Sequence, residues 1–292
     1  MYLGFYGLSK QPFEATPDPG YVYLGSSHCE AIASLLYGIE RNLGFMALVA
    51  EPGMGKTTLI LRLMKRLEAG ARTACLFQVP RSSEEFIAQL VAGLGCEIKD
   101  EAPSSLHAVL KGVLLQEAKA NRRVVVFIDE AENLSDSILE AVLQLSKPEV
   151  PSKNPVQIVF SGRPQLTETL ARPSMVQLSL RISMVSRLNG LTPWEVGEYV
   201  RHRLRRSGGD GRSVFTAEAL DLIAKCSQGI PGNINHICLK ALSLGRARQR
   251  KLVDSSIVRE AISDSQLPRV PLVRQSPGDL ATSRFALYTQ HR

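Results

Sequence analysis

The chain has 292 residues, a formal net charge of +7, 44% hydrophobic residues and 22% charged residues. These values favour one or two folded domains over a small disulfide-stapled module. No run of 18 apolar residues and no secretory signal is present, so we expect a cytoplasmic protein without a membrane span of its own. The five cysteines are too widely spaced for a zinc knuckle or a redox pair.

The chain begins with a segment rich in aromatic residues and prolines, FYGLSKQPFEATPDPGYVYLGSSH (5–28). This composition predicts an ordered, extended arm that packs on another part of the protein. We expect the arm and a first helix to occupy residues 1–43 and to pack on the core.

From residue 44 to residue 188, short β-branched runs alternate with longer segments of helical period. This alternation is typical of a parallel sheet covered by crossover helices, and it predicts an α/β core. The expected strands are 44–50, 73–79, 124–129, 156–162 and 182–188. The expected helices lie near 56–69, 83–94, 105–120, 136–146 and 164–171.

After residue 188 the strand pattern stops and amphipathic helical segments follow. Their expected starts are after Thr192–Pro193, after Thr216, at Pro231 and after Asp254, each with a residue suited to a helix N-terminus. We therefore expect a helical domain over 189–264. Scattered prolines without a sustained period predict a flexible tail over 265–292.

Residues 50–57 read AEPGMGKT, which matches the phosphate-loop pattern G-x-x-x-x-G-K-S/T except at Ala50. Glycine matters most where the backbone approaches the phosphates, at Gly53 and Gly55, and both are present. Ala50 lies at the exit of a strand, where a methyl group should be tolerated. Lys56 is expected to reach the β and γ phosphates and Thr57 to hold Mg²⁺. The expected nucleotide-binding residues of this loop are Glu51, Pro52, Gly53, Met54, Gly55, Lys56, Thr57 and Thr58.

A second motif, VVVFIDEAENL (124–134), ends an apolar strand in two carboxylates. Asp129 is expected to complete the Mg²⁺ shell with Thr57, and Glu130 to polarise an attacking water. An additional strand lies between the two motifs, which indicates the additional-strand class of P-loop ATPases. The expected cofactors are ATP and Mg²⁺.

These residues resemble the AAA+ ATPases of the ExeA/GspA type, which are associated with bacterial general secretion and related pilus systems. The resemblance covers about residues 4–264. It implies sheet order 5-1-4-3-2 followed by a helical lid. Larger members add a membrane helix and a periplasmic domain, so this chain is expected to belong to a short, soluble branch. The resemblance is carried by FYGLSKQPFEATPDP, HCEAIASLLYGI, the phosphate loop, VFIDEAENL, QIVFSGRPQL, LSLRI and GIPGNINHICLKAL.

The resemblance also implies roles for residues outside the two motifs. Arg181 in LSLRI is the candidate arginine finger, which would reach the γ-phosphate of a neighbouring subunit and make hydrolysis depend on assembly. The end of the fourth strand is expected to supply a polar group that orients water, either Ser161 or Arg163.

The chain departs from the family pattern at Gly232, where an arginine of the lid can contact the γ-phosphate. We infer that ATP binds and that fast hydrolysis by an isolated subunit is in doubt. Ile230 and Pro231 are expected to pack against adenine together with the arm around Phe13 and Pro17.

Three functions remain open at this point. The first is an ATP-driven assembly switch, a homo-oligomer that acts on a secretion or pilus partner. The second is a DNA-bound regulator of the transposition or origin-recognition type, because the whole net charge lies beyond residue 187. The third is a regulatory ATP binder with little hydrolysis. The basic clusters that suggest DNA are Arg201, Arg203, Arg205 and Arg206, and Arg246, Arg248, Arg250 and Lys251.

Overall fold

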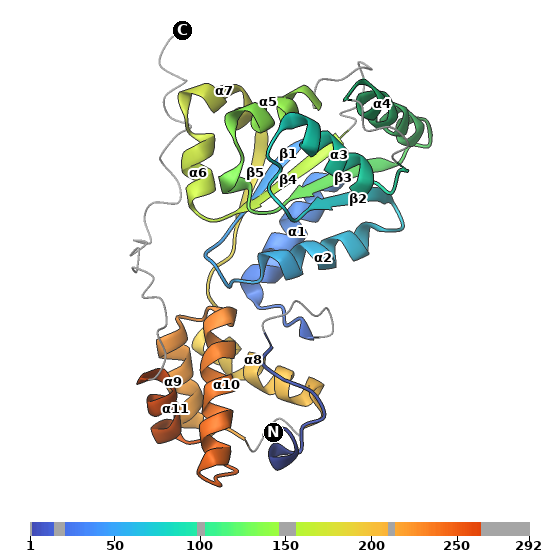
Figure 1. The fold of residues 1–292 in the computed structure, drawn as a ribbon. Coiled ribbons are helices and arrows are strands. Elements are labelled where there is room, and N and C mark those ends of the chain that lie inside the picture. The colour runs from blue at the N-terminus through green and yellow to red at the C-terminus, as the bar shows by residue number, and fades with distance from the viewer. Residues whose placement is uncertain (1, 15–20, 98–102, 146–155, 210–213, 264–292) are drawn as a thin grey trace.

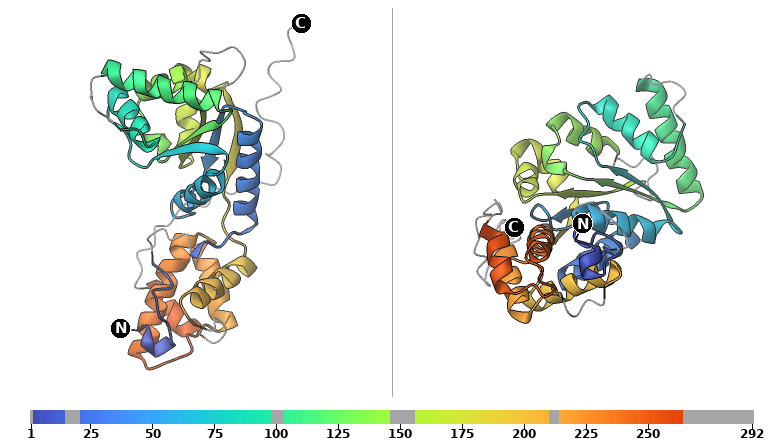
Figure 2. Two further views of the ribbon diagram at one scale, coloured as in Figure 1. Left: turned by 90° about the vertical axis from the view of Figure 1, so that its right-hand side faces the viewer. Right: turned by 60° about the horizontal axis from the view of Figure 1, so that its bottom comes forward.

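The computed structural model of the protein describes residues 2–14, 21–97, 103–145, 156–209 and 214–263. The α/β core and the helical lid form two lobes, and the N-terminal arm runs beside the lid (Figures 1 and 2). The expected tail and Pro17 lie outside the described residues.

The core is a five-stranded parallel sheet with the order β2-β3-β4-β1-β5. This is the predicted order 5-1-4-3-2 read from the other edge, so the topology is confirmed. The three central strands are buried almost throughout because helices cover both faces of the sheet. The strands are β1 (Phe45–Val49), β2 (Ala71–Leu76), β3 (Arg123–Ile128), β4 (Val156–Gly162) and β5 (Ile182–Arg187).

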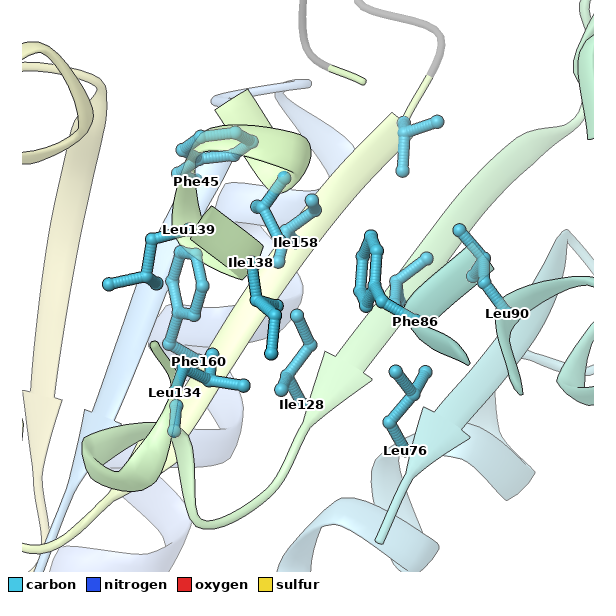
Figure 3. Close-up of a cluster of buried hydrophobic side chains, with 14 of the residues drawn as sticks. Phe45, Leu76, Phe86, Leu90, Ile128, Leu134, Ile138, Leu139, Ile158 and Phe160 are labelled. Carbon is cyan, nitrogen blue, oxygen red and sulfur yellow. The ribbon is translucent and has the colours of Figure 1, made fainter. Parts of the chain in front are cut away.

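Alternate residues of each strand enter two different apolar clusters. Phe45 and Phe160 face one side, where Phe86 and Ile138 cover them (Figure 3), and Met46 faces the other side. Full burial of such a side chain stabilises the fold by about 1.5–3 kcal/mol. The first side is covered by α3 (Ser83–Gly93), α4 (Pro103–Lys119), α5 (Asp136–Leu145), α6 (Gln165–Leu170) and the short α7 (Val176–Ser179), and the second by α1 (Ser26–Glu40) and α2 (Lys56–Leu67).

The lid consists of helices that begin where the sequence predicts them. Thr192 forms a capping box with Glu195, the Thr216 side chain accepts a hydrogen bond from the Ala219 N–H, and Pro231 occupies the first turn of its helix. These local signals place the helix starts without reference to tertiary contacts. The lid helices are α8 (Pro193–Arg206), α9 (Ala217–Ser227), α10 (Pro231–Ala247) and α11 (Ser255–Ser263).

The arm lies on the lid, which differs from the expectation that it packs on the core. Leu8 and Phe13 belong to the apolar cluster of the lid, and the Phe13 ring meets the Phe215 ring edge-on at 6.5 Å. The Ser9 N–H also donates to the Ser207 carbonyl at 2.8 Å. Helix α1 does pack on the core, as expected. The chain therefore passes from lid to core between the arm and α1, and returns to the lid after β5.

Candidate functional site

The loop between β1 and α2 has the backbone geometry of a phosphate-binding turn. Gly53 has φ +78° and Gly55 has φ +87°, a region that residues with a side chain rarely adopt. Ala50 is not among the described residues with positive φ, and its N–H donates to the Gly162 carbonyl at 3.1 Å. Alanine is thus compatible with this position. Helix α2 starts directly at Lys56, so its free N–H groups face the loop.

Asp129 is the point where three polar groups of the site converge. Its Oδ2 accepts a hydrogen bond from Thr57 Oγ1 at 2.7 Å, and its Oδ1 accepts from Ser161 Oγ at 2.8 Å and from the Glu130 N–H at 3.1 Å. The parallel strands bring these residues together because their carboxyl ends meet at one edge of the sheet.

The Thr57 hydroxyl and the Asp129 carboxylate suit Mg²⁺, which prefers oxygen ligands and completes its shell with phosphate and water. In the described part of the chain no three His, Cys, Asp or Glu side chains form a metal site by themselves. The residues present therefore fit a metal that arrives together with a phosphate ligand.

Lys56 lies along the loop and is held by backbone carbonyls. Its Nζ donates to the Ala50 oxygen at 2.7 Å and to the Glu51 oxygen at 3.2 Å. Burial lowers the pKa of Lys56, although the carboxylates of Asp129 and Glu132 act in the opposite direction. An anionic phosphate beside the ammonium would favour its charged form in the same way.

A cavity of about 630 Å³ extends from this loop between the arm and the lid. Its volume is in the range of small-molecule and cofactor sites. Of the expected site residues, Pro52, Gly53, Met54, Gly55, Lys56, Thr57, Thr58, Asp129, Glu130 and Pro231 line it, together with Phe13 and Arg163.

Four expected site residues, Glu51, Ser161, Ile230 and Arg181, do not line the cavity. Ile230 is 6% exposed and packs in the core cluster with Met54, so its side chain joins the lid to the core. Ser161 is fully buried beneath Asp129. Arg163 is therefore the polar side chain at the end of β4 that faces the cavity.

Arg181 lies at the end of the sheet opposite the phosphate loop. In the β1–β5 register, Phe45 pairs with Ile182 and Val49 pairs with Arg187. Since a strand rises about 3.3 Å per residue, Arg181 is about 20 Å from the loop end of β5. It does not line its own cavity, and its action on a neighbouring subunit stays a prediction.

Sequence reasoning missed Glu132 as a site residue. Its side chain is 7% exposed and pairs with the Arg163 Nε at 3.3 Å, while the Arg163 N–H donates to the same carboxylate at 3.1 Å. Both residues line the cavity. The signal that could have found Glu132 is its place two residues after the acidic pair that ends β3.

His28, in the first turn of α1, supports the phosphate loop. Its ring is 6% exposed, and Nε2 donates to the Met54 carbonyl at 3.0 Å. The segment around His28 was singled out only by the family resemblance, because nothing in its local pattern indicates contact with the loop.

The basic cluster on α8 differs from a free cationic surface. Arg203 is 8% exposed, and its Nε donates to the Pro12 carbonyl at 2.6 Å. Arg201 lies 2.5 Å from the Glu198 carboxylate, which Arg205 approaches to 3.9 Å. Arg203 is therefore buried away from any nucleic acid, and Glu198 partly neutralises the charges of Arg201 and Arg205. The second cluster is also partly paired, by an ion pair of Arg248 with Glu260.

The lid touches the phosphate loop at the position where the family pattern has an arginine. The Gly232 N–H donates to the Gly53 carbonyl at 3.0 Å, and a Cβ on Gly232 would lie 3.1 Å from the Gly53 Cα. A side chain at residue 232 would require the loop or the lid to shift. Glycine at residue 232 thus has two consequences: the lid brings no arginine to this position, and its backbone can approach the phosphate loop closely.

Comparisons with known proteins agree on the class of the core. The AAA domain model matches residues 39–170. General secretion pathway protein A of Aeromonas hydrophila is 34% identical over 259 residues, 88% of this chain and 47% of that protein. The chain thus spans about half the length of this curated relative. None of the helices in the described part of the chain is long and apolar enough to cross a membrane.

Solved structures with the same fold are more distant in sequence. The Aeropyrum pernix ORC2 protein has a TM-score of 0.66 and 18% identity, over 88% of this chain and 72% of that one. Cdc6p from Pyrobaculum aerophilum has a TM-score of 0.68 and 16% identity, over 86% and 70%. The Thermotoga maritima RuvB Holliday junction branch migration motor has a TM-score of 0.55 and 17% identity, over 81% and 67%. At these identities the similarity shows the fold alone.

Proposed function

The chain is an AAA domain protein with the α/β P-loop fold and a helical lid, and from this premise we propose that it is an ATP-driven assembly switch. The observation that carries the proposal is the convergence of Thr57 and Ser161 on Asp129 beside a loop whose two glycines are left-handed. The loop amides, Lys56 and the Thr57–Asp129 pair lie around one cavity, which supports the binding of a phosphate together with Mg²⁺.

The residues of the cavity divide the chemistry of ATP hydrolysis among them. The loop N–H groups and Lys56 bind the phosphates, and Thr57 and Asp129 hold Mg²⁺, which neutralises charge on the phosphates when bound. Glu130 lines the cavity beside Asp129 and is exposed, so it is available to polarise an attacking water. Ser161 fixes the Asp129 carboxylate, and Arg163 adds a cation on the core side.

The switch follows from the position of the cavity between core, arm and lid. Gly232 of the lid contacts Gly53 of the phosphate loop, and the arm that lines the cavity is attached to the lid. A bound triphosphate would contact these parts together, and the loss of its γ-phosphate would remove contacts with the loop. Differential contact of this kind is what a nucleotide needs to shift a conformational equilibrium.

We further propose that the protein forms a homo-oligomer in which Arg181 completes the cavity of a neighbouring subunit. The remote position of Arg181 in its own chain supports this role. The proposed partner belongs to a secretion or pilus system, on the strength of the similarity to general secretion pathway protein A.

One observation favours a second candidate, a regulatory ATP binder with little hydrolysis. Gly232 brings no cation to the γ-phosphate, and a side chain at this position would require the phosphate loop or the lid to shift. Both candidates bind ATP. They differ in whether assembled subunits turn it over.

Calorimetric titration with Mg·ATP tests the shared part of both candidates. We expect the wild-type protein to bind and Lys56→Ala to bind at least tenfold more weakly, since Lys56 lies in the cavity. Lys65→Ala is the matched control, because Lys65 is an exposed lysine in the last turn of the same helix. Equal affinities for all three proteins, or no binding at all, would refute the proposal.

Hydrolysis measured against protein concentration separates the two candidates. A specific activity that rises with concentration and is lost in Arg181→Ala supports the assembly switch. Activity that stays at zero at every concentration supports the regulatory binder.

A further inference from the structure

Aromatic rings line the part of the cavity that the arm and the lid form, which we call the aromatic end. Phe13, Tyr21 and Tyr23 come from the arm, and Tyr199 comes from α8. The Tyr23 and Tyr199 rings meet edge-on at 5.9 Å. Such a lining suits a flat, apolar ring that carries a few polar atoms. Asn235 of α10 adds an amide to this aromatic end.

The orientation of the Asn235 amide is fixed by its partners. Its Oδ1 accepts from Tyr199 Oη at 2.8 Å and from Arg203 Nη1 at 3.3 Å. A guanidinium has only donors, so the amide atom that faces Arg203 must be the oxygen. Arg203 Nη1 also donates to Tyr199 Oη at 2.7 Å, which leaves the phenol proton for Asn235. Hydrogen bonds therefore run from Arg203 through Tyr199 to the Asn235 oxygen.

Arg203 attaches this network to the arm. Its Nε donates to the Pro12 carbonyl and its Nη2 to the Glu14 carbonyl at 3.3 Å, while its guanidinium lies 5.0 Å from the centre of the Tyr21 ring. Burial raises the pKa of Tyr199, so its phenol stays protonated at neutral pH. Buried networks of this kind hold their members in one geometry.

With Oδ1 occupied, the two N–H bonds of Asn235 Nδ2 remain. Nδ2 makes no hydrogen bond to any residue within the described parts of the chain. The amide is partly exposed and belongs to the cavity wall. A ligand beside this amide would therefore bind most tightly if it carried a hydrogen-bond acceptor there.

We propose that Asn235 donates a hydrogen bond to a ring nitrogen of the base of the bound nucleotide, and that Tyr199 and Arg203 position it. The inference rests on the proposed function, because it assigns the aromatic end of the cavity to the base of a nucleotide whose phosphates lie at the loop. Asn235 is then a base-recognition residue that the arm holds in place through Arg203.

The variant Asn235→Asp isolates the donor. Its carboxylate still accepts hydrogen bonds from Tyr199 and Arg203, but an acceptor replaces the two N–H groups. Asn233→Asp is the matched control, because it introduces the same charge two residues away on α10, outside the cavity lining. Binding of Mg·ATP, Mg·dATP and magnesium tripolyphosphate would be measured by calorimetry for the three proteins.

We expect Asn235→Asp to weaken ATP and dATP at least tenfold, since a lone pair of the base would then face a carboxylate. The affinity for tripolyphosphate, which has no base, should change less than threefold. In Asn233→Asp, the affinities for all three ligands should also change less than threefold. Equal losses in the two variants, or an equal loss for tripolyphosphate, would overturn the proposal. A loss for ATP but none for dATP would place the contact on the ribose 2′-hydroxyl and overturn the base assignment.

The variant Tyr199→Phe tests the positioning role while keeping the ring. It removes one of the two anchors of the Asn235 oxygen, and we expect a three- to tenfold loss for ATP and dATP with tripolyphosphate unchanged. A uniform loss for all three ligands would show a general structural role and contradict positioning. If the wild-type protein binds neither ATP nor tripolyphosphate, the proposed function itself fails. If it binds both and Asn235→Asp has no effect, only this inference fails.

Discussion

Glu195 joins the two lobes, and its replacement by glutamine should weaken that junction. The side chain is 7% exposed. Its Oε1 accepts hydrogen bonds from the Ser26 N–H at 2.7 Å and the Ser26 hydroxyl at 2.9 Å, and its Oε2 accepts from the Thr192 N–H at 2.8 Å. One carboxylate thus caps the first helix of the core lobe and the first helix of the lid. Glutamine keeps one acceptor and turns an NH₂ group toward an N–H donor.

The pKa of Glu195 gives the size of the effect. Burial acts to raise it, but the hydrogen bonds from Ser26 and Thr192 prevail and hold the pKa at about 2, against 4.5 ordinarily. At about 1.4 kcal/mol per pH unit, the difference between 4.5 and about 2 sets an upper limit of about 3.5 kcal/mol on the contribution of the carboxylate to the free energy of unfolding, and screening by solvent lowers the expected value to about 2–3 kcal/mol. Because the folded pKa is the lower one, this contribution is present above pH 4.5 and is lost as the pH falls from about 4.5 to about 2.

Urea unfolding followed by circular dichroism checks this reasoning. At pH 7 we expect Glu195→Gln to lower the free energy of unfolding by about 2–3 kcal/mol, and the difference from wild type should shrink below pH 4.5. Glu198→Gln on the same helix is the control, with an expected loss under about 1 kcal/mol because its ion pairs are partly exposed. A loss under about 0.5 kcal/mol for Glu195→Gln at pH 7 would refute the account of the junction.

Three further predictions concern the phosphate loop and the lid. Gly55→Ala forces a residue with a side chain to φ +87°. The free energy of unfolding in urea should therefore fall by about 1 kcal/mol, and the affinity for ATP measured by calorimetry should fall as well. No change in either quantity would contradict the strained turn. Thr57→Ala should lower the affinity for ATP about tenfold in the presence of Mg²⁺ and leave the affinity unchanged in EDTA. An equal loss of affinity in both buffers would argue against Thr57 as a metal ligand. Gly232→Arg should not raise ATP turnover, because its Cβ would lie 3.1 Å from the Gly53 Cα; a higher rate in a phosphate-release assay would show that the lid moves freely enough to accept the side chain.

Local sequence rules were enough for most of the core and for the phosphate-loop and strand-end residues that line the cavity. The strand from Val156 to Gly162 was predicted with its observed limits, because apolar runs of this length bounded by turn residues have few alternatives. The loop glycines and Asp129 follow from a pattern whose members are close in sequence or end a strand. Helix starts in the lid were set by Thr192, Thr216 and Pro231 for the same local reason.

Residues that act through distant contacts were missed or misplaced. Arg203 looks like a surface cation in the sequence, yet it is buried against carbonyls of the arm about 190 residues earlier. Ile230 is next to a cavity residue in sequence but packs in the core. Asn235 lines the cavity only because the lid places α10 beside the arm. No periodicity or spacing encodes such pairings.

The sequence by itself determined the parallel sheet, the phosphate loop with its acidic partner and the starts of the lid helices, because each depends on propensity, periodicity or hydrogen bonds within a few residues. Only the tertiary structure decided that the arm lies on the lid, that Gly232 touches Gly53, and that Arg181 is far from its own cavity. These features depend on packing between elements that are far apart in the sequence. The free energy of such packing is the sum of contacts from many side chains, so no single segment determines it.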